Sequence, residues 1–322
     1  MIQGLLNAPR LSVLLCNYND SALLPRALEG FFSQTAPPDE VVVVDDGSTD
    51  QSVALLEAAA ARHPELRLVR NERNLGVSGA TARGLEHARG EHIYFAACDH
   101  RLKPGFFKAA LDALARHPEA GFCQTDYESL DGQAYNFHLS DGPAYFSPGE
   151  AAALCRRIGY WPGSGCSQIL RRAAVLEAGG IQPELRGLLD VWMSLVIAAR
   201  RGFCYVPGSY MAVDRRPGAY SHRLRRWSEQ RFIGRFLFRL LDSEDYRDVR
   251  DWIRRAGVWP PLQPWLICAL MGEPRRWRFL SLRTLRQAAA DTAKTYLAGR
   301  LSLRSLRALA SARDAWRRLL KP

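Results

Sequence analysis

The sequence predicts an α/β fold in which helices flank a mostly parallel β-sheet, followed by a helical C-terminal region. Two observations lead to this prediction. Short apolar segments alternate with segments of helical periodicity four times between residues 11 and 107. The second apolar segment, Val41–Val44, also lacks alternating polar residues, which is typical of a strand with both faces covered by helices. Both observations favour right-handed βαβ units.

The elements follow in order along the first third of the chain. Four strands are expected, each a short apolar run that ends at turn-forming residues. The strands are predicted at residues 11–16, 40–44 and 66–69, and from His92 onward. Helices are predicted between them, from Leu24 to Phe32, around Val53 to Ala59, and from Ser78 to Arg89. Beyond Gly121 the pattern is looser, with a strand at 122–125, a loop or hairpin region at 126–147 and a last core strand at 205–207.

Three polar clusters come directly after predicted strands. They are Asn17-Tyr18-Asn19, Asp45-Asp46-Gly47-Ser48 and Cys98-Asp99-His100. One Asp after a strand is commonly a turn former. Because the carboxyl ends of parallel strands share an edge where ligands bind, three such clusters together predict a nucleotide pocket.

Two common nucleotide-binding motifs are absent. No Gly-x-Gly-x-x-Gly follows the first strand, and the chain has no Gly-x-x-x-x-Gly-Lys phosphate loop. A nicotinamide dehydrogenase and a nucleoside triphosphatase are therefore disfavoured.

Charge divides the chain into two parts. Residues 223–322 hold 23 of the 44 Lys and Arg but 9 of the 33 Asp and Glu, a net charge of +14 against −3 for the rest. We therefore expect two regions, a near-neutral domain at residues 1–222 and a basic helical region at residues 223–322. A basic region of this kind faces an anionic partner, such as a lipid surface or nucleic acid.

The cysteines and the N-terminus indicate a cytoplasmic protein. The seven cysteines are scattered and contain no Cys-x-x-Cys pair, so neither a disulfide framework nor a zinc site is predicted. Residues 1–10 lack the basic flank and apolar core of a signal peptide. The longest apolar run near the end, residues 265–271, is too short to span a bilayer.

In their order and spacing the motifs of residues 10–222 resemble the family 2 glycosyltransferases. These are inverting enzymes of the GT-A fold, which has a Rossmann-like sheet. The matching segments are residues 12–19, 44–50, 74–80, the stretch around Asp99, residues 179–181 and residues 189–192. The resemblance implies a nucleoside diphosphate-sugar donor, foremost a UDP-sugar. The residues that it implies for donor binding are Cys16, Asn17, Asn19, Asp46, Ser48, Arg83 and Cys98.

The resemblance also implies roles for three carboxylates. Asp46 would accept a hydrogen bond from the base, Asp99 would bind a divalent metal, Mn²⁺ or Mg²⁺, and Asp190 would be the catalytic base. The chemistry agrees, because a hard cation stabilises a diphosphate leaving group and one carboxylate can accept the proton of an acceptor hydroxyl. For Asp190, a favourable position near a helix N-terminus is the alternative interpretation.

The metal motif departs from the pattern of the family. Ala97 and His100 occupy positions that are usually acidic, with Cys98 between Ala97 and Asp99. His100 is interpreted as a second metal ligand, with a phosphate contact or a solvated loop position as alternatives. The alternative interpretation of Cys98 is that it is a small packing residue.

An acceptor site is predicted downstream. Trp161, Gly163, Ser164 and Trp192 are its candidate residues, because exposed aromatic rings stack on sugars and glycines allow close approach. The alternative interpretation of Trp161 is that its ring packs in the core. Arg215, Arg216 or His222 would fold over the diphosphate, or else carry solvated loop charges.

The basic region is predicted to be helical throughout. Arg231, Arg235 and Arg239 recur every four residues beside an apolar face that begins at Phe232, and a basic stripe recurs at residues 304–319. Basic amphipathic helices of this kind lie on anionic membranes, so peripheral contact with the inner face of the membrane is one hypothesis. Packing on the catalytic domain or on a partner subunit is the other. No base-reading module is present, so nucleic acid is not expected as a partner.

The expected function is sugar transfer to a glycan or lipid-linked acceptor in the synthesis of cell-surface glycans or polysaccharides. Two rivals remain at this point. A nucleotidyltransferase also places a metal site at strand ends but normally has a glycine-rich basic loop after the first strand. A non-catalytic binding protein on the same fold is suggested by Ala97 and His100.

Overall fold

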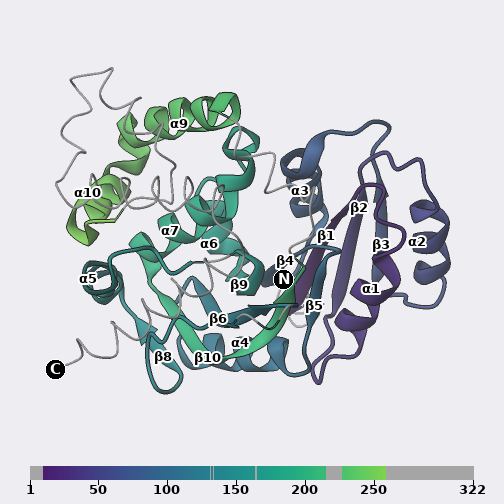
Figure 1. The fold of residues 1–322 in the computed structure, drawn as a ribbon, viewed down its shortest axis with the longest axis horizontal. Helices are drawn as coiled ribbons and strands as arrows, with labels where there is room; N and C mark the ends of the chain where they lie inside the picture. Colours follow the sequence, from purple (N-terminus) through teal and green to yellow (C-terminus); the bar gives the residue numbers. More distant parts are fainter. Residues whose placement is uncertain (1–9, 131, 133, 164, 215–226, 259–322) are drawn as a thin grey trace, which may run out of the picture. The chain divides into compact units, whose positions relative to one another are not determined.

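Ten β-strands form one sheet at the centre of the protein (Figure 1). The computed structural model describes residues 10–130, 132, 134–163, 165–214 and 227–258. All of these belong to one compact unit.

The first half of the sheet is parallel, as predicted. It contains β1 (Leu11–Asn17), β2 (Glu40–Asp45), β3 (Leu66–Arg70) and β4 (His92–Ala96) in the order β3-β2-β1-β4. The register pairs Cys16 with Val44 and Leu14 with Phe95. All six residues of β2 are buried, which is the double coverage that its apolar sequence predicts.

The second half of the sheet is mixed. Here β9 (Gln168–Arg171) runs antiparallel to both β4 and β6 (Phe122–Ser129). β10 (Phe203–Val213) lies parallel to β6 and antiparallel to two short strands, β5 (His100–Leu102) and β8 (Ala144–Phe146). The two-residue strand β7 (Ala134–Tyr135) pairs with β6.

Three sequence-based assignments are corrected here. β6 ends at Ser129 rather than at residue 125, although its last residues pair with β7 in the hairpin that was one expectation for residues 126–147, and β10 continues far beyond residues 205–207. β10 accommodates Pro207 where its register with β6 shifts, because a proline cannot donate to a regular ladder. His100, expected in a loop, begins the strand β5, since it pairs with Val213.

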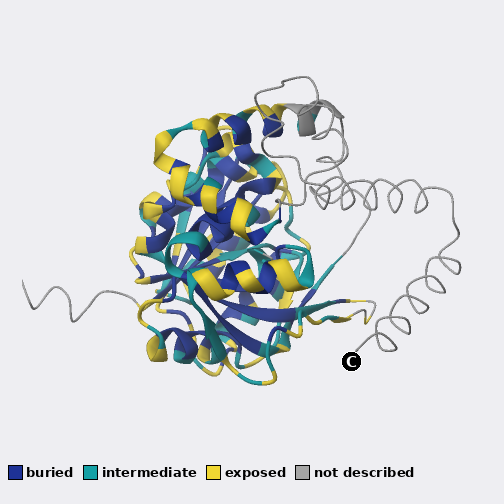
Figure 2. Cartoon of the chain, turned by 90° about the vertical axis from the view of Figure 1, so that its left-hand side faces the viewer, coloured by how far each residue is buried: buried dark blue, intermediate teal, exposed yellow. Residues whose placement is uncertain are grey.

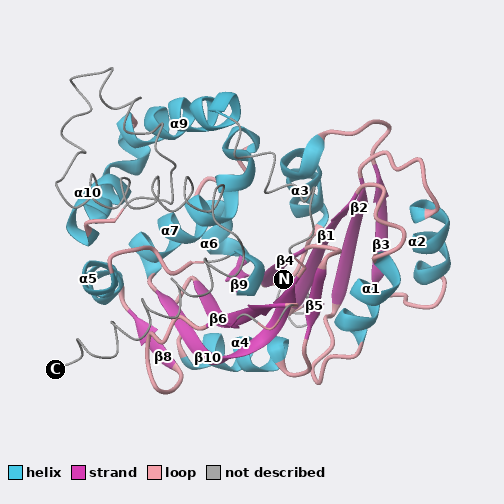
Figure 3. Ribbon diagram, viewed as in Figure 1, coloured by secondary structure: helices cyan, strands magenta, loops and turns pink. Residues whose placement is uncertain are grey.

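Helices cover both faces of the sheet (Figure 3). In chain order they are α1 (Leu24–Phe32), α2 (Ser52–Ala60), α3 (Gly76–His87), α4 (Phe106–Arg116), α5 (Pro148–Ile158), α6 (Arg172–Glu177), α7 (Leu189–Arg201), α9 (Trp227–Asp242) and α10 (Arg247–Ala256). Three 3-10 helices, η1 (Gly165–Ser167), η2 (Pro183–Leu188) and η3 (Glu244–Tyr246), connect them.

Alternate residues of the parallel strands face different helices. Leu11, Val13 and Leu15 join a core cluster with residues of α1, α2 and α4, whereas Leu14 faces α3 on the other side. α3 approaches closely because Gly84 has no side chain, and a Cβ there would lie 3.2 Å from Val44 Cγ2. Figure 2, which faces α5 and α10, shows strands coloured as buried among helices that have both buried and exposed residues.

The crossing of α3 to the second face creates a topological switch point. α1 and α2 connect β1 to β2 and β2 to β3 on one face, and α3 then returns on the other face to place β4 beside β1. In open α/β sheets, ligands bind outside the carboxyl ends of the strands at this point. The residues there are Asn17 after β1 and the segment Cys98–His100 after β4.

The described helices of the C-terminal region pack on the body of the domain. α9 buries Ile233, Leu237 and Leu241, and α10 contacts α5 and α7. Trp252 Nε1 donates a hydrogen bond of 2.7 Å to the carbonyl of Pro148. The predicted basic stripe at 304–319 lies outside the described residues. No helix among the described residues is both long enough and apolar enough to cross a membrane.

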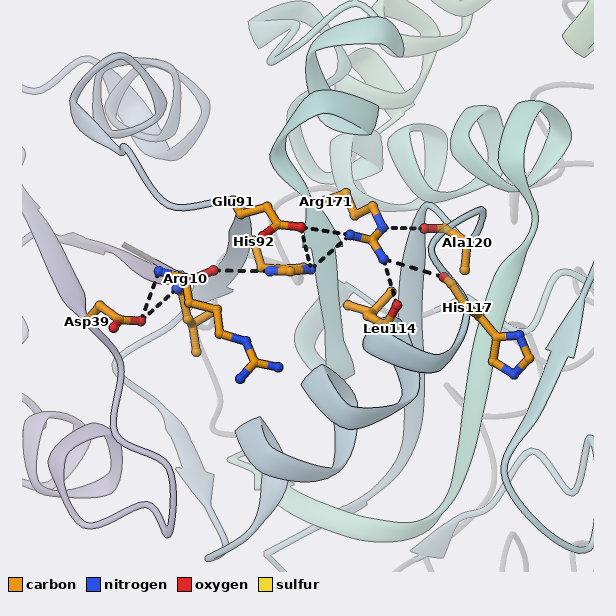
Figure 4. Close-up of polar contacts among 9 residues, drawn as sticks. Arg10, Asp39, Glu91, His92, Leu114, His117, Ala120 and Arg171 are labelled. Carbon is orange, nitrogen blue, oxygen red and sulfur yellow. Dashed lines mark hydrogen bonds and ion pairs between the residues drawn. The ribbon is translucent and has the colours of Figure 1, made fainter. Parts of the chain in front are cut away.

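A polar network holds the opposite edge of the sheet together (Figure 4). Arg171, at the end of β9, donates from Nε to the carbonyl of Ala120 at 2.9 Å and from Nη2 to that of Leu114 at 2.7 Å. Its Nη1 reaches Glu91 Oε1 at 2.9 Å and His92 Nε2 at 3.3 Å. Burial lowers the pKa of His92, so the neutral ring can accept from Arg171 and donate to the backbone at Arg10.

We predict that Arg171→Met lowers the free energy of unfolding by about 2–4 kcal/mol, because it leaves buried carbonyls and Glu91 without their donor. Urea denaturation of the full chain measures this. Arg70→Met is the matched control, since the Arg70–Glu57 pair is 61% and 60% exposed and should cost about 0–1 kcal/mol. Equal losses for the two variants would contradict the role given to Arg171.

Candidate active site

The loops after β1 and β2 are fastened to each other by side chains. Asn17 Nδ2 donates to Asp45 Oδ2 at 2.9 Å and to Ser48 Oγ at 3.1 Å. The other oxygen of Asp45 accepts from the backbone amide of Ser48 at 3.0 Å. Two residues predicted to bind the donor, Asn17 and Ser48, are therefore brought together, and Asp45 fixes both of them.

Asn19 completes this loop. Its backbone has a positive φ of 54°, a conformation that Asn tolerates better than most residues. The backbone amide of Asn19 donates to Ser48 Oγ at 3.0 Å, and its side-chain Oδ1 accepts from the backbone amide of Thr49 at 2.8 Å. The side chain of Asn19 therefore fixes the conformation of the loop next to the switch point.

Asp46 is buried and anchors the start of α3. Its Oδ1 accepts from Asn71 Nδ2 at 2.7 Å and from the amide of Leu75 at 2.8 Å, while its Oδ2 accepts from the amide of Gly76 at 2.8 Å. A carboxylate has about four acceptor positions, so about one remains for a ligand. Asn71 Oδ1 lies next to it, buried and without a partner among the described residues.

Two cysteines lie between β1, β4 and α3. Cys16 Sγ lies 3.3 Å from Thr81 Oγ1, and burial raises the pKa of Cys16 to about 11, so the thiol stays protonated at neutral pH. Cys98 is buried, with its Sγ 3.8 Å from Asn17 Oδ1. Arg83 lies on α3, about two turns beyond Gly76, and is partly buried.

Asp99 directly precedes β5, and His100 is the first residue of that strand, next to the switch point. His100 Nε2 is 3.7 Å from Asp99 Oδ1, and the Asp99 carbonyl accepts from the amide of Asp214 at 3.3 Å. Burial lowers the pKa of His100, which favours the neutral imidazole. Its Nδ1 is buried and has no partner among the described residues.

These two residues fit a metal that the ligand helps to hold. No group of three or more His, Cys, Asp or Glu side chains in the described part of the chain could hold an ion alone. Mg²⁺, however, is commonly bound by one or two carboxylates together with substrate phosphates, and a neutral imidazole also suits Mn²⁺. The donor set therefore fits a divalent ion that binds together with a diphosphate.

Tyr94 connects this side of the site to the acceptor side. Its hydroxyl donates to the carbonyl of Cys166 at 3.2 Å. Burial, Cys166 and Asp99 raise its pKa far above the usual value, so Tyr94 remains a neutral donor. Tyr94 therefore contacts the Gly165–Ser167 turn and lies within electrostatic reach of Asp99.

Asp190 lies in the first turn of α7, beside this turn. Its Oδ1 accepts from the amide of Val191 at 2.8 Å, and the amide of Gly165 also donates to the carboxylate. Burial raises the pKa of Asp190, and these amides oppose the rise. A Cβ on Gly165 would collide with the Asp190 carboxylate, so only glycine permits this approach.

The predicted acceptor residues lie mostly in the core. Trp161 is 6% exposed, packs edge-on against Phe203 and Trp252, and donates to Ser194 Oγ. Trp192 is 1% exposed and packs beside Tyr246. Neither ring is free to stack on a sugar, so both predictions of a stacking role are corrected to core packing. Gly163 makes room for Trp161, because a Cβ there would strike the indole.

Some predicted residues lie outside the described part of the chain. These are Ser164, Arg215, Arg216 and His222. Conversely, sequence reasoning missed the roles of Asp45, Asn71, Tyr94 and Gly165. Tyr94 could have been found, since it lies on a predicted strand directly upstream of Asp99, but the contacts of Asn71 and Gly165 are long-range in sequence.

A family model, "Glycosyl transferase family 2", matches residues 12–178. Among curated relatives, the uncharacterized protein MT1568 of Mycobacterium tuberculosis is 32% identical over 213 residues, 62% of this chain and 65% of the relative. The succinoglycan biosynthesis protein ExoO of Rhizobium meliloti is 33% identical over 127 residues, 39% of this chain and 36% of the relative. The chain thus spans less than two thirds of the length of these relatives.

Solved structures share the fold. TarS of S. aureus in complex with UDP-GlcNAc superposes with a TM-score of 0.64 at 20% identity, covering 89% of each chain. The mannosyltransferase PcManGT from Pyrobaculum calidifontis, in complex with GDP-Man and Mn²⁺, gives 0.54 at 20% identity, covering 96% of this chain and 80% of the other. Both likenesses extend over most of the chain, well beyond the segment that the family model matches.

We predict that Asp46→Asn lowers the free energy of unfolding by about 1–3 kcal/mol, because an amide nitrogen cannot accept from the Gly76 amide. Thermal or urea denaturation measures this loss. Asp112→Asn is the control, since Asp112 forms only an exposed pair with Lys108; it should change stability by less than about 0.5 kcal/mol. The anchoring of α3 by Asp46 is refuted if both variants behave alike.

Proposed function

The chain belongs to glycosyl transferase family 2, and from this premise we propose that it is an inverting glycosyltransferase. It moves a sugar from a nucleoside diphosphate-sugar, foremost a UDP-sugar, to a hydroxyl of a glycan or lipid-linked acceptor in the synthesis of cell-surface glycan or polysaccharide. The observations that support this proposal are the Asp46 carboxylate at the start of α3, the Asp99–His100 pair after β4, and the Asp190 carboxylate beside the Gly165–Ser167 turn, where the Cys166 carbonyl accepts from Tyr94.

The donor site that we propose lies over Cys16, Asn17, Asp46, Cys98 and Arg83. The remaining acceptor position of Asp46 suits a ring N–H of a nucleobase, and the adjacent Asn71 Oδ1 offers a second acceptor. The fastened loop of Asn17, Asn19 and Ser48 pre-organises this site, which reduces the entropic cost of binding. TarS with UDP-GlcNAc and PcManGT with GDP-Man are examples of such donors on this fold.

Asp99 and His100 would hold the divalent ion, Mn²⁺ or Mg²⁺. Such an ion supplies Lewis-acid stabilisation of the diphosphate as the glycosidic bond breaks. The neutral imidazole of His100 leaves Asp99 as the charged ligand, and the buried, unpartnered Nδ1 of His100 is a further donor atom for the site.

Asp190 is proposed as the single base. Its carboxylate is held by the amides of Val191 and Gly165, and its raised pKa makes the ionised form a stronger proton acceptor than an exposed Asp. It would take the proton of the acceptor hydroxyl as this oxygen attacks the anomeric carbon. Attack from the side opposite the leaving diphosphate, with one base and no covalent intermediate, inverts the anomeric centre.

The charge distribution supports a proposal on location. With a net charge of +14, residues 223–322 would attach the catalytic domain, residues 1–222, to the inner face of an anionic membrane. The packing of α10 on α5 and α7, and of α9 on η2, would then hold the active site close to that surface.

We expect nucleoside diphosphate-sugars to raise the melting temperature when Mn²⁺ is present. At 100 times Kd the gain is about 2.7 kcal/mol, which corresponds to about 5 °C for a chain of this size. Thermal shift with UDP-GlcNAc, UDP-glucose, UDP-galactose and GDP-mannose, with and without Mn²⁺, measures it. ATP is the control, and a shift with ATP but with no nucleotide sugar would favour the nucleotidyltransferase alternative.

Asp190→Asn should reduce the release of nucleoside diphosphate from the selected donor by about 10²–10⁴-fold, since the base is lost. Donor binding, measured by the same thermal shift, should remain unchanged. Because the pKa of Asp190 is raised, wild-type kcat/KM should fall with decreasing pH at values above the ordinary Asp pKa of about 3.9. Glu184→Gln, at an exposed acidic residue in η2, is the control. Full activity of Asp190→Asn would remove Asp190 from its proposed role.

A further inference from the structure

We propose that Arg186 is a positioning residue for Asp190, through which helix α9 fixes the first turn of α7. The inference rests on the proposed function, because it takes Asp190 as the catalytic base. It assigns a task to α9, which lies beyond the segment matched by the family model.

The first observation is the backbone of Arg186. It has φ 47° and ψ −123°, inside a 3-10 helix whose other residues are helical. Few residues other than glycine adopt a positive φ, and such strain persists only where the surroundings hold the residue in place. Arg186 lies four residues before Asp190, and η2 continues directly into α7.

The second observation is what holds Arg186. Its Nη1 forms an ion pair with Glu229 Oε2, and its guanidinium lies 4.4 Å from the centre of the Phe232 ring. Glu229 and Phe232 lie three residues apart on α9 and so share one face of that helix. The Phe232 ring is 41% exposed, so core packing does not account for its position, whereas stacking with the guanidinium does.

The third observation is where η2 lies. It packs against α3, α7 and α9, and its Leu185 and Leu188 are buried. η2 therefore joins the helix anchored by Asp46, the helix that carries Asp190, and the C-terminal region. The Arg186 clamp, defined as Arg186 with Glu229 and Phe232, holds this junction to α9.

The fit at Asp190 explains why the junction matters. Gly165 approaches the carboxylate so closely that no Cβ fits between them. A small displacement of the first turn of α7 would therefore break the contact with the Gly165 amide and move the base. Misplacement of a catalytic group by about 1 Å can reduce turnover about 100-fold.

The chain offers a matched control at the other end of α7. Arg200 pairs with Asp248 at 2.8 Å and lies 5.4 Å from the Tyr246 ring centre. This clamp has the same chemistry as that of Arg186, an arginine with a carboxylate and an aromatic ring, and it ties α7 to η3 and α10. It lies about three turns from Asp190, so its loss should affect stability but not the base.

The test uses the full-length chain and four variants: Arg186→Gly, Arg186→Lys, Glu229→Gln and Arg200→Met. Arg186→Gly removes both the clamp and the backbone strain, so it should cost little in melting temperature. It should nevertheless accelerate hydrogen–deuterium exchange of residues 187–193 at least tenfold. Release of nucleoside diphosphate should fall about 10–100-fold in kcat, with the donor KM within twofold.

The other variants separate positioning from stability. Arg186→Lys keeps the charge and should restore most of kcat, and Glu229→Gln should lower kcat as Arg186→Gly does. Arg200→Met should lower the melting temperature while kcat stays within twofold. The proposal is overturned if exchange at residues 187–193 is unchanged in Arg186→Gly, or if kcat follows melting temperature across all variants. If exchange responds as expected but the wild type releases no nucleoside diphosphate from any donor, the clamp stands and the proposed function fails.

Discussion

The site depends on the hydrogen bonds that the Asp46 carboxylate accepts at the start of α3. α3 is the helix that crosses to the second face of the sheet, so its position decides whether β4 lies beside β1 and where the switch point opens. A carboxylate near the positive end of a helix is electrostatically favourable. Here the carboxylate belongs to Asp46, directly after β2, whereas α3 follows β3 in the chain. One buried side chain therefore links the sheet, the crossing helix and the proposed nucleoside site.

The two sides of the site are built by different physical means. After β1 and β2, Asn17, Asn19, Asp45 and Ser48 form hydrogen bonds with one another or with the neighbouring backbone, which fasten the two loops together. Near α7, Gly163 and Gly165 bring the backbone against Trp161 and Asp190. Burial raises the pKa of Cys16 and Tyr94 and lowers that of His100, so it favours the neutral form of all three side chains.

The sequence predicts the parallel half of the sheet well because the information there is local. Apolar runs, intervening helical periodicity and strand-end polar clusters each depend on neighbouring residues, and β1 to β4 follow them. β5 and β9 were not predicted, since strands of three and four residues form only through pairing with β10, β4 and β6. The tryptophans show the same limit. Trp161 and Trp192 can be read from the sequence, but their burial depends on packing against Phe203, Trp252 and Tyr246. The clustering of Asn17, Ser48, Asp46 and Asp99 was predictable from topology, whereas the Arg186 clamp joins residues that no local pattern connects.

The close approach of Gly165 to Asp190 has an evolutionary consequence. Since every larger side chain at position 165 meets the carboxylate, natural variation cannot adjust the pocket from this turn. Changes in substrate preference within a lineage must instead arise in segments with open space. Gly132 and Gly142, in the connection from β6 to β8, are two such positions, because an added Cβ meets no atom within 4 Å at either. Side chains can therefore be added in this connection without displacing a neighbour, whereas position 165 beside Asp190 admits none.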